Sequence, residues 1–229
     1  MSEQLAKEES LTKGINKKDS QNNKGNTYRM MKRTSDIIFA SIGILISLPV
    51  LLCISITYLY GRNKGPIFFK QIRIGQNGRE FYMYKFRSMV VNAETILRED
   101  KKLYKKYLNN NYKLEQDEDP RITKIGRFLR KSSLDELPQL INVLKGDMSI
   151  VGPRPVIREE LKEYDLRLDE FLAVKPGVTG YWQICGRSDV GYPERANLEY
   201  YYIDHQGLVM DTKIIIKTAL LVLTKKGAY

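Results

Sequence analysis

The chain has 229 residues, enough for one sizeable hydrophobic core or for a small domain with appendages. Its formal net charge of +11 calls for an anionic partner, which is nucleic acid, an acidic membrane surface or a phosphorylated substrate. The two cysteines, Cys53 and Cys185, give no disulfide framework, and a single His205 without a cysteine cluster excludes a zinc site of the usual kind, so the composition is typical of a reducing compartment.

Residues 1–28 are rich in Lys, Glu, Asn, Ser and Gln and hold few large apolar side chains. Such a segment cannot bury enough apolar surface to offset the loss of chain entropy, so we expect a disordered N-terminal tail. The tail lacks the layout of a cleaved signal peptide, because the apolar run begins too late and no small-residue cleavage site follows it.

Residues 37–60 contain no charged side chain. At ~1.5 Å per residue, a straight helix of that length would extend about 36 Å, enough to cross a hydrocarbon core of ~30 Å. Two features favour instead a re-entrant helix that enters and leaves through the same face. Pro49 breaks the hydrogen-bond ladder near the middle, where the Ser47 hydroxyl offers a substitute partner, and basic residues, which prefer the cytoplasmic side, flank both ends. An ordinary kinked spanning helix stays open as the alternative.

Two β-prone runs, residues 67–73 and 80–86, follow the membrane segment. The turn between them contains Gly75 and Gly78, and since no Walker or dinucleotide pattern is present, we predict a β-hairpin and not a phosphate loop. Lys85 stands among aromatic residues of the second run, where a surface lysine with a buried stem is the alternative to a functional cation.

Four further helices are predicted, over residues 92–111, 121–131, 158–173 and 214–223. The second of them has an apolar face beside a basic one. Such a helix suits the headgroup region of an anionic membrane, and it equally suits a core-packed position with a solvated basic side.

Two adjacent carboxylates, Asp135 and Glu136, lie at the start of another predicted helix. Pro138 belongs in a first turn and Gly146 beyond a last one, so we predict an N-cap at or near Asp135. The dipole and free N–H groups of a helix start favour a carboxylate, so Asp135 is expected to stay ionised at neutral pH, and they also attract phosphate. The alternative is a capping box, in which Ser133 and Glu136 only satisfy backbone N–H groups. The apolar stripe of this helix comprises Leu134, Leu137, Ile141 and Leu144.

Several motifs then occur in order: KFR at 85–87, DPRIT at 119–123, GRFLRK at 126–131, LDELPQL at 134–140, GDMSIVGPRP at 146–155 and PGVTGYWQ at 176–183. They resemble the bacterial sugar transferase family, the monotopic phosphoglycosyltransferases that start glycan assembly on a polyprenol phosphate. The resemblance runs from about Met31 to Tyr229.

The resemblance implies an α+β, mainly helical fold: a disordered tail over residues 1–28, a re-entrant membrane helix-hairpin over 29–62, and a small cytosolic catalytic domain over 63–229. That domain is expected to have a short β-hairpin and amphipathic interfacial helices, on the cytoplasmic face of the bacterial inner membrane. Family members bend at a Ser-Pro pair, whereas here Ser47 and Pro49 are separated by Leu48.

The implied reaction transfers a sugar-1-phosphate from a UDP-sugar to undecaprenyl phosphate and releases UMP. Asp135 matches the family's nucleophile, and with Glu136 it is expected to hold Mg²⁺. Lys85, Arg130 and Arg154 are expected to bind phosphates, and Arg187 is a candidate contact to the nucleotide. These three cations, Arg187 and the two acids are the predicted site.

One departure from the family pattern is Asn197, which stands where the family often has Asp. The C-terminal ending resembles members that begin capsule and exopolysaccharide repeats, which favours UDP-glucose or UDP-galactose, although N-acetylated sugars stay open. The competing hypothesis is a non-catalytic, membrane-anchored scaffold that binds acidic lipids. Nucleic-acid binding is disfavoured by the uncharged run over 37–60, and formation of a homo-oligomer stays open.

Overall fold

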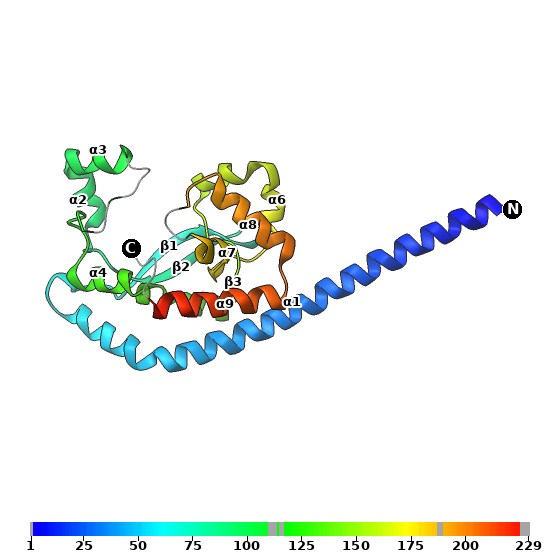
Figure 1. Ribbon diagram of the computed structural model, residues 1–229. Helices are drawn as coiled ribbons and strands as arrows, with labels where there is room; N and C mark the ends of the chain where they lie inside the picture. Colours follow the sequence, from blue (N-terminus) through cyan, green and yellow to red (C-terminus); the bar gives the residue numbers. More distant parts are fainter. Residues whose placement is uncertain (1, 110–113, 115–116, 187–189, 225–229) are drawn as a thin grey trace.

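The computed structural model of the chain describes the backbone of residues 2–109, 114, 117–186 and 190–224 (Figure 1). Side chains are described from Gly25 onward, apart from residues 109, 165, 166 and 223 within those ranges. Most of the described chain is helical, with one long apolar helix near the N-terminus and two small pairs of strands.

The long helix α1 (Ser2–Ile56) runs beneath the remaining elements, and its N-terminal part projects away from them (Figure 1). Within it, Gly25–Leu59 is long and apolar enough to cross a membrane, by length and composition. The projecting part includes most of the predicted tail, whose disorder stays a prediction. At the predicted boundary of the tail, the Tyr28 hydroxyl donates to Asp211, 3.0 Å away.

A helix-break-helix hairpin at Pro49 is not shown. Pro49 lies inside α1, which continues to Ile56 before the chain turns back through two 3₁₀ turns, η1 (Thr57–Leu59) and η2 (Gly61–Asn63). The Ser47 hydroxyl donates to the carbonyl of Ile44 at 3.2 Å. The carbonyl that Pro49 leaves without its helix donor is that of Leu45, so this bond does not test the expected role of Ser47. Helix α1 passes the proline without ending.

The predicted hairpin is confirmed. Strands β1 (Phe68–Ile74) and β2 (Glu80–Phe86) pair antiparallel, and the turn η3 (Gln76–Gly78) has left-handed backbone at Asn77 and Gly78. A second, parallel pair, β3 (Ser149–Val151) and β4 (Gly177–Thr179), was not predicted.

The helical predictions needed correction mainly at their ends. The segment 92–111 contains two helices, α2 (Ala93–Glu99) and α3 (Lys101–Asn109), because the Asp100 carboxylate accepts the N–H groups of Lys102 and Leu103 and starts a new helix. The segment 158–173 is mostly a 3₁₀ helix. The remaining elements are α4 (Lys124–Lys131), η4 (Leu134–Glu136), α5 (Gln139–Lys145), η5 (Arg158–Arg167), α6 (Leu168–Leu172), α7 (Tyr181–Cys185), α8 (Glu194–His205) and α9 (Leu208–Leu223).

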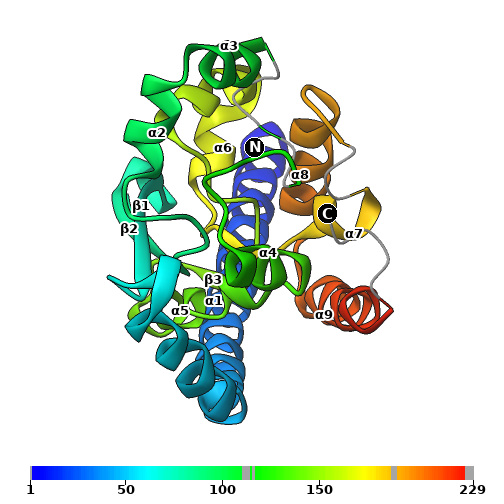
Figure 2. The same cartoon turned by 90° about the vertical axis from the view of Figure 1, so that its left-hand side faces the viewer.

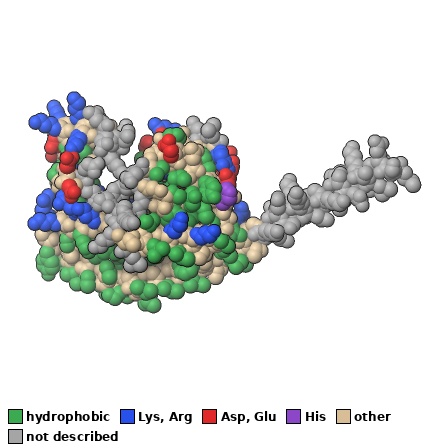
Figure 3. All heavy atoms as spheres, in the orientation of Figure 1, with side chains coloured by type: hydrophobic (Ala, Val, Ile, Leu, Met, Phe, Trp, Pro, Cys, Tyr) green, Lys and Arg blue, Asp and Glu red, His purple; other side chains and the backbone are tan. Residues whose placement is uncertain are grey.

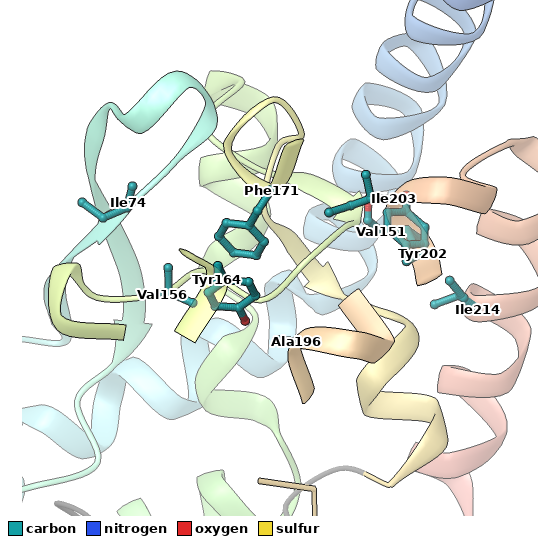
Figure 4. Packing of buried hydrophobic residues seen from close by; sticks show 9 residues of the cluster. All are labelled: Ile74, Val151, Val156, Tyr164, Phe171, Ala196, Tyr202, Ile203 and Ile214. Carbon is teal, nitrogen blue, oxygen red and sulfur yellow. The ribbon is translucent and has the colours of Figure 1, made fainter. Parts of the chain in front are cut away.

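The main core lies between β1, β3, η5, α6, α8 and α9 (Figure 4). At its centre the rings of Tyr164 and Phe171 stack with centroids 3.9 Å apart. Two smaller clusters include residues of α1. In one, Ala40 packs with residues of β2 and α5; in the other, Ile54 of α1 and Tyr58 of η1 pack with Phe86. One side of the membrane-type helix is thus part of the domain core.

The other side of α1 is apolar and exposed. Figure 3 shows hydrophobic side chains along the lower edge of the molecule, over α1, and Figure 2 shows α1 flanked by α5 and α9. Leu45 and Ile46 are 71% and 73% exposed. An uncovered apolar face of this length is typical of a membrane-contacting surface. Its members include Ile38, Phe39, Ile42, Leu45, Ile46, Leu52 and Ile56 of α1, and Ile216, Leu220 and Val222 of α9.

Candidate active site

The two acids lie in the 3₁₀ turn η4, which connects α4 to α5. Ser133 precedes the turn in a left-handed conformation (φ 56°), and Pro138 is the N-cap of α5. The predicted N-cap at Asp135 is therefore wrong by about one turn. The capping box is also not formed, since the Ser133 side chain makes no cap hydrogen bond and Glu136 pairs with Lys85.

Asp135 is buried, with only 9% of its surface exposed. Burial raises the pKa of Asp135 to about 6; the positive charges of Lys85 and Arg130 oppose the rise, and the negative charge of Glu136 adds to it. We expected the start of a helix to hold this pKa low. Desolvation outweighs that effect, yet a pKa of about 6 still leaves the carboxylate mostly ionised at pH 7.

Glu136 is the partner of Lys85. The Lys85 Nζ of β2 donates to Glu136 Oε1 at 2.6 Å, and the Glu136 side chain is 36% exposed. Burial acts to raise the pKa of Glu136, but the charge and hydrogen bond of Lys85 outweigh it, with help from Arg154, so this pKa lies below its usual range. The dyad thus combines a firmly ionised glutamate with an aspartate that titrates close to neutrality.

Arg130 approaches the dyad from the last turn of α4. Its Nε donates to the Ser88 hydroxyl at 2.8 Å, while burial lowers its pKa and the neighbouring charge of Asp135 raises it. The helix can lie this close because Gly126 has no side chain: a Cβ there would stand 1.8 Å from the Ser88 carbonyl oxygen. The close approach of α4 at Gly126 therefore places Arg130 within hydrogen-bond distance of Ser88, beside Asp135.

Arg154 follows β3, and its charge acts on Glu136. Its guanidinium lies 5.5 Å from the ring centroid of Trp182, and its backbone N–H donates to both carboxylate oxygens of Glu199. The structure thus brings Lys85, Arg130 and Arg154 around Asp135 and Glu136. The remaining predicted contact, Arg187, lies outside the described residues.

Three further residues near Arg154 were not predicted as site residues. Arg73 is buried, and burial together with the charge of Arg154 lowers its pKa to about 10. The Arg195 guanidinium lies 4.6 Å from the Trp182 centroid, and Glu199 is buried behind Arg154. Within the described part of the chain, four buried nitrogens here have no hydrogen-bond partner: Nε of Arg73, Arg154 and Arg195, and Nε1 of Trp182. Buried donors of this kind suit an anionic ligand or water.

No group of three or more His, Cys, Asp or Glu side chains placed to hold a metal ion occurs among the residues that the structure describes. The dyad nevertheless has the donor chemistry that Mg²⁺ prefers, because this ion is usually bound by one or two carboxylates and completed by water and phosphate oxygens. Asp135 and Glu136 fit such a site.

An apolar helix built into a small domain, beside a buried acid among cations, favours a protein that associates with a membrane. Residues 27–225 match the bacterial sugar transferase family, and the chain belongs to that family.

Three relatives illustrate the range of similarity. The undecaprenyl-phosphate galactose phosphotransferase of Salmonella typhimurium is 44% identical over 204 residues, which cover 88% of this chain and 42% of that protein. The exopolysaccharide production protein ExoY of Sinorhizobium fredii is 40% identical over 202 residues, covering 86% and 88%. The UDP-glucose:undecaprenyl-phosphate glucose-1-phosphate transferase of Escherichia coli is 38% identical over 209 residues, covering 88% and 42%. The chain spans less than half the length of the first and the third.

Proposed function

We propose that the chain transfers a sugar-1-phosphate from a UDP-sugar to undecaprenyl phosphate, as a first step in the assembly of a capsule, exopolysaccharide or other glycoconjugate. The observation that carries the proposal is the buried Asp135, set beside the Lys85–Glu136 ion pair at the position of the family's nucleophile. Relatives named for galactose and glucose transfer support a hexose-1-phosphate as the transferred group.

The difficulty of the reaction is electrostatic, because two anionic phosphates must meet. A covalent route separates them. An Asp135 carboxylate oxygen bonds to the β-phosphorus of the donor, the bond from that phosphorus to the bridging oxygen breaks, and UMP leaves with the electron pair. An oxygen of the lipid phosphate then attacks the same phosphorus and releases the Asp135 carboxylate. The product is a lipid diphosphate sugar.

The remaining residues supply charge and position. Lys85 and Arg154 bracket Glu136 and bind donor oxygens, and Arg130 balances Asp135 while it is ionised. Arg187 remains a proposed nucleotide contact. Mg²⁺, held by Asp135 and Glu136, would neutralise charge on the phosphates when bound.

The contacts of α1 support a monotopic placement, with the catalytic domain on the cytoplasmic face of the inner membrane. The domain touches this helix from Tyr28, which donates to Asp211, to Ile54, which packs with Phe86. In the turn η1 that follows, Tyr58 donates to the carbonyl of Arg87 at 2.6 Å. A helix that crossed the bilayer would carry these charged surfaces into the hydrocarbon, whereas a re-entrant or in-plane helix leaves them at the headgroups. Basic residues beside the apolar face would contact anionic lipids.

The decisive experiment looks for the intermediate. Purified protein is incubated with a panel of UDP-sugars without lipid acceptor, and its intact mass and its UMP release are measured. We expect a sugar-phosphate adduct that maps to Asp135, is absent from Asp135→Asn and persists in the exposed control Asp117→Asn. Sustained UMP release by wild type with no adduct at Asp135 under acid quench would refute the covalent route. Inability of wild type to release UMP from any donor would favour the non-catalytic scaffold.

The placement has its own test. Cysteines at Ser10 and at Lys105, in a background without Cys53 and Cys185, are labelled in sealed vesicles with a reagent that does not cross the bilayer. Monotopic topology predicts the same accessibility for both positions. Labelling from opposite sides would show a spanning helix.

A further inference from the structure

Glu199 is a carboxyl group enclosed in the protein interior. It lies in the middle of α8, and only 1% of its surface is exposed. Burial raises its pKa to about 8; the N–H group and charge of Arg154 and the charge of Arg195 oppose the rise, and Glu160 adds to it. Burying a carboxyl group at such a position costs free energy of folding, so the contacts of Glu199 indicate what the group contributes.

Both carboxylate oxygens of Glu199 accept the backbone N–H of Arg154, at 3.0 and 2.9 Å. Arg154 stands between Pro153 and Pro155, which have no N–H group, so this is the one backbone donor of the Pro-Arg-Pro run. Neighbouring carbonyls have other partners: Gly177 donates to Pro153 O at 2.8 Å, and Arg73 to Pro155 O at 3.1 Å. Glu199 therefore determines the orientation of the peptide plane that carries the Arg154 side chain.

The same face of α8 makes two further contacts next to this loop. Tyr202, one turn after Glu199, places its hydroxyl 3.3 Å from the carbonyl of Val151. Arg195, one turn before, lies against the Trp182 ring that also carries the Arg154 guanidinium. Residues 195, 199 and 202 have the spacing of one helix face. One face of α8 therefore contacts the backbone of Arg154 directly, through Glu199, and the Arg154 side chain indirectly, through the Trp182 ring.

We propose that Glu199 is a positioning residue that directs the Arg154 guanidinium toward Glu136 and the phosphates of the donor. The proposal rests on the proposed function for its kinetic consequence, but its structural consequence can be measured without activity. Glu199 touches no reacting atom, and its hydrogen bonds go to Arg154, so the proposal predicts that its removal acts mainly through Arg154.

The structural test is hydrogen–deuterium exchange of the full-length protein in detergent. Because Arg154 has the single amide of the Pro-Arg-Pro run, its exchange can be isolated in peptides that end on either side of it. We expect at least tenfold faster exchange at Arg154 in Glu199→Ala, an intermediate rate in Glu199→Gln, which keeps one acceptor oxygen, and no change in Glu194→Ala at the exposed start of α8. Equal exchange at Arg154 in wild type and Glu199→Ala would overturn the proposal.

The kinetic test is a double-mutant cycle on UMP release. Glu199→Ala should lower kcat/KM about tenfold, with Glu199→Gln restoring most of the loss. In an Arg154→Gln background, Glu199→Ala should add less than a twofold loss, because there is no guanidinium left to position. Fully additive losses would overturn the role of Glu199 while leaving the proposed function intact; a wild type that releases no UMP would refute the function, and exchange at Arg154 would still decide the positioning.

Discussion

Replacement of Lys85 with Gln should change the pH dependence of the reaction and not only its rate. The Lys85 charge lowers the pKa of Asp135, which burial has raised to about 6. An opposite charge at close range typically shifts a carboxyl pKa by about 1–3 units, and since Lys85 is 26% exposed and shared with Glu136, we take the lower limit of about one unit. At pH 6 the ionised fraction of Asp135 would then fall from about one half to about one tenth, whereas at pH 8 it would scarcely change.

The assay is the initial rate of UMP release between pH 5.5 and 8.5 at subsaturating donor. Lost phosphate binding lowers the rate of Lys85→Gln at every pH, so the informative quantity is the ratio of wild-type to variant rates. We expect this ratio to fall roughly fivefold from pH 6 to pH 8. The control Lys105→Gln on the outer helix α3 should keep a ratio near one throughout. A ratio for Lys85→Gln that does not vary with pH would show that the titrating group is not Asp135 or that Lys85 does not act on it.

Three further predictions concern the acids and the α4 contact. Asp135→Asn should lower UMP release by a factor on the order of 10³ or more in a folded protein, measured against Asp117→Asn; activity within tenfold of wild type would contradict a nucleophilic role. Gly126→Ala should destabilise the protein by on the order of 3 kcal/mol, because its Cβ would overlap the Ser88 carbonyl, and a thermal midpoint equal to wild type would show that α4 moves freely. Since the Glu199 pKa is raised in the folded state, the unfolded chain releases this proton first, so stability falls as pH rises from about 4.5 to about 8. Glu199→Gln should remove that part of the pH dependence and reduce the drop in thermal midpoint between pH 5 and 8 by roughly 10 °C, whereas Glu194→Gln should leave it unchanged.

The resemblance to the family, more than any local signal, located most of the candidate site. The order of motifs placed Lys85 on a strand, Arg130 at the end of a helix and Arg154 after a Gly-Pro pair, and the structure brings all three to the dyad. The hairpin was predictable because its turn residues and alternating strands are adjacent in the chain. The β3–β4 pair was not, because two three-residue strands separated by 25 residues carry no periodic signal.

The pKa of Asp135 and the role of Glu199 could not be predicted because the tertiary fold decides which side chains are buried. The local pattern suggested a helix start that holds the pKa of Asp135 low, yet β2 and α4 enclose the carboxyl and raise it. The family pattern suggested an acid at position 197, where this chain has Asn. Asn197 is exposed, whereas Glu199, two positions later, faces the Pro-Arg-Pro loop. The one available signal was the helical spacing of Arg195, Glu199 and Tyr202, which is informative only once the loop that they contact is known.

Further contacts of α1 connect this helix to the segments that carry Asp135 and Arg154. The Arg33 guanidinium donates to the carbonyls of Val143 and Leu144, 2.6 and 2.8 Å away, at the last turn of α5. Asp36 accepts the Ile150 N–H at 2.9 Å, at the strand that leads to Arg154. The end of α5, which follows the turn with Asp135, and strand β3, which precedes Arg154, are therefore both bound by α1, at positions one helical turn apart. A flexible tether would allow the domain to lie at many distances from the membrane surface. In the proposed placement, these contacts instead couple the depth of Asp135 to the depth at which the apolar face of α1 enters the lipid.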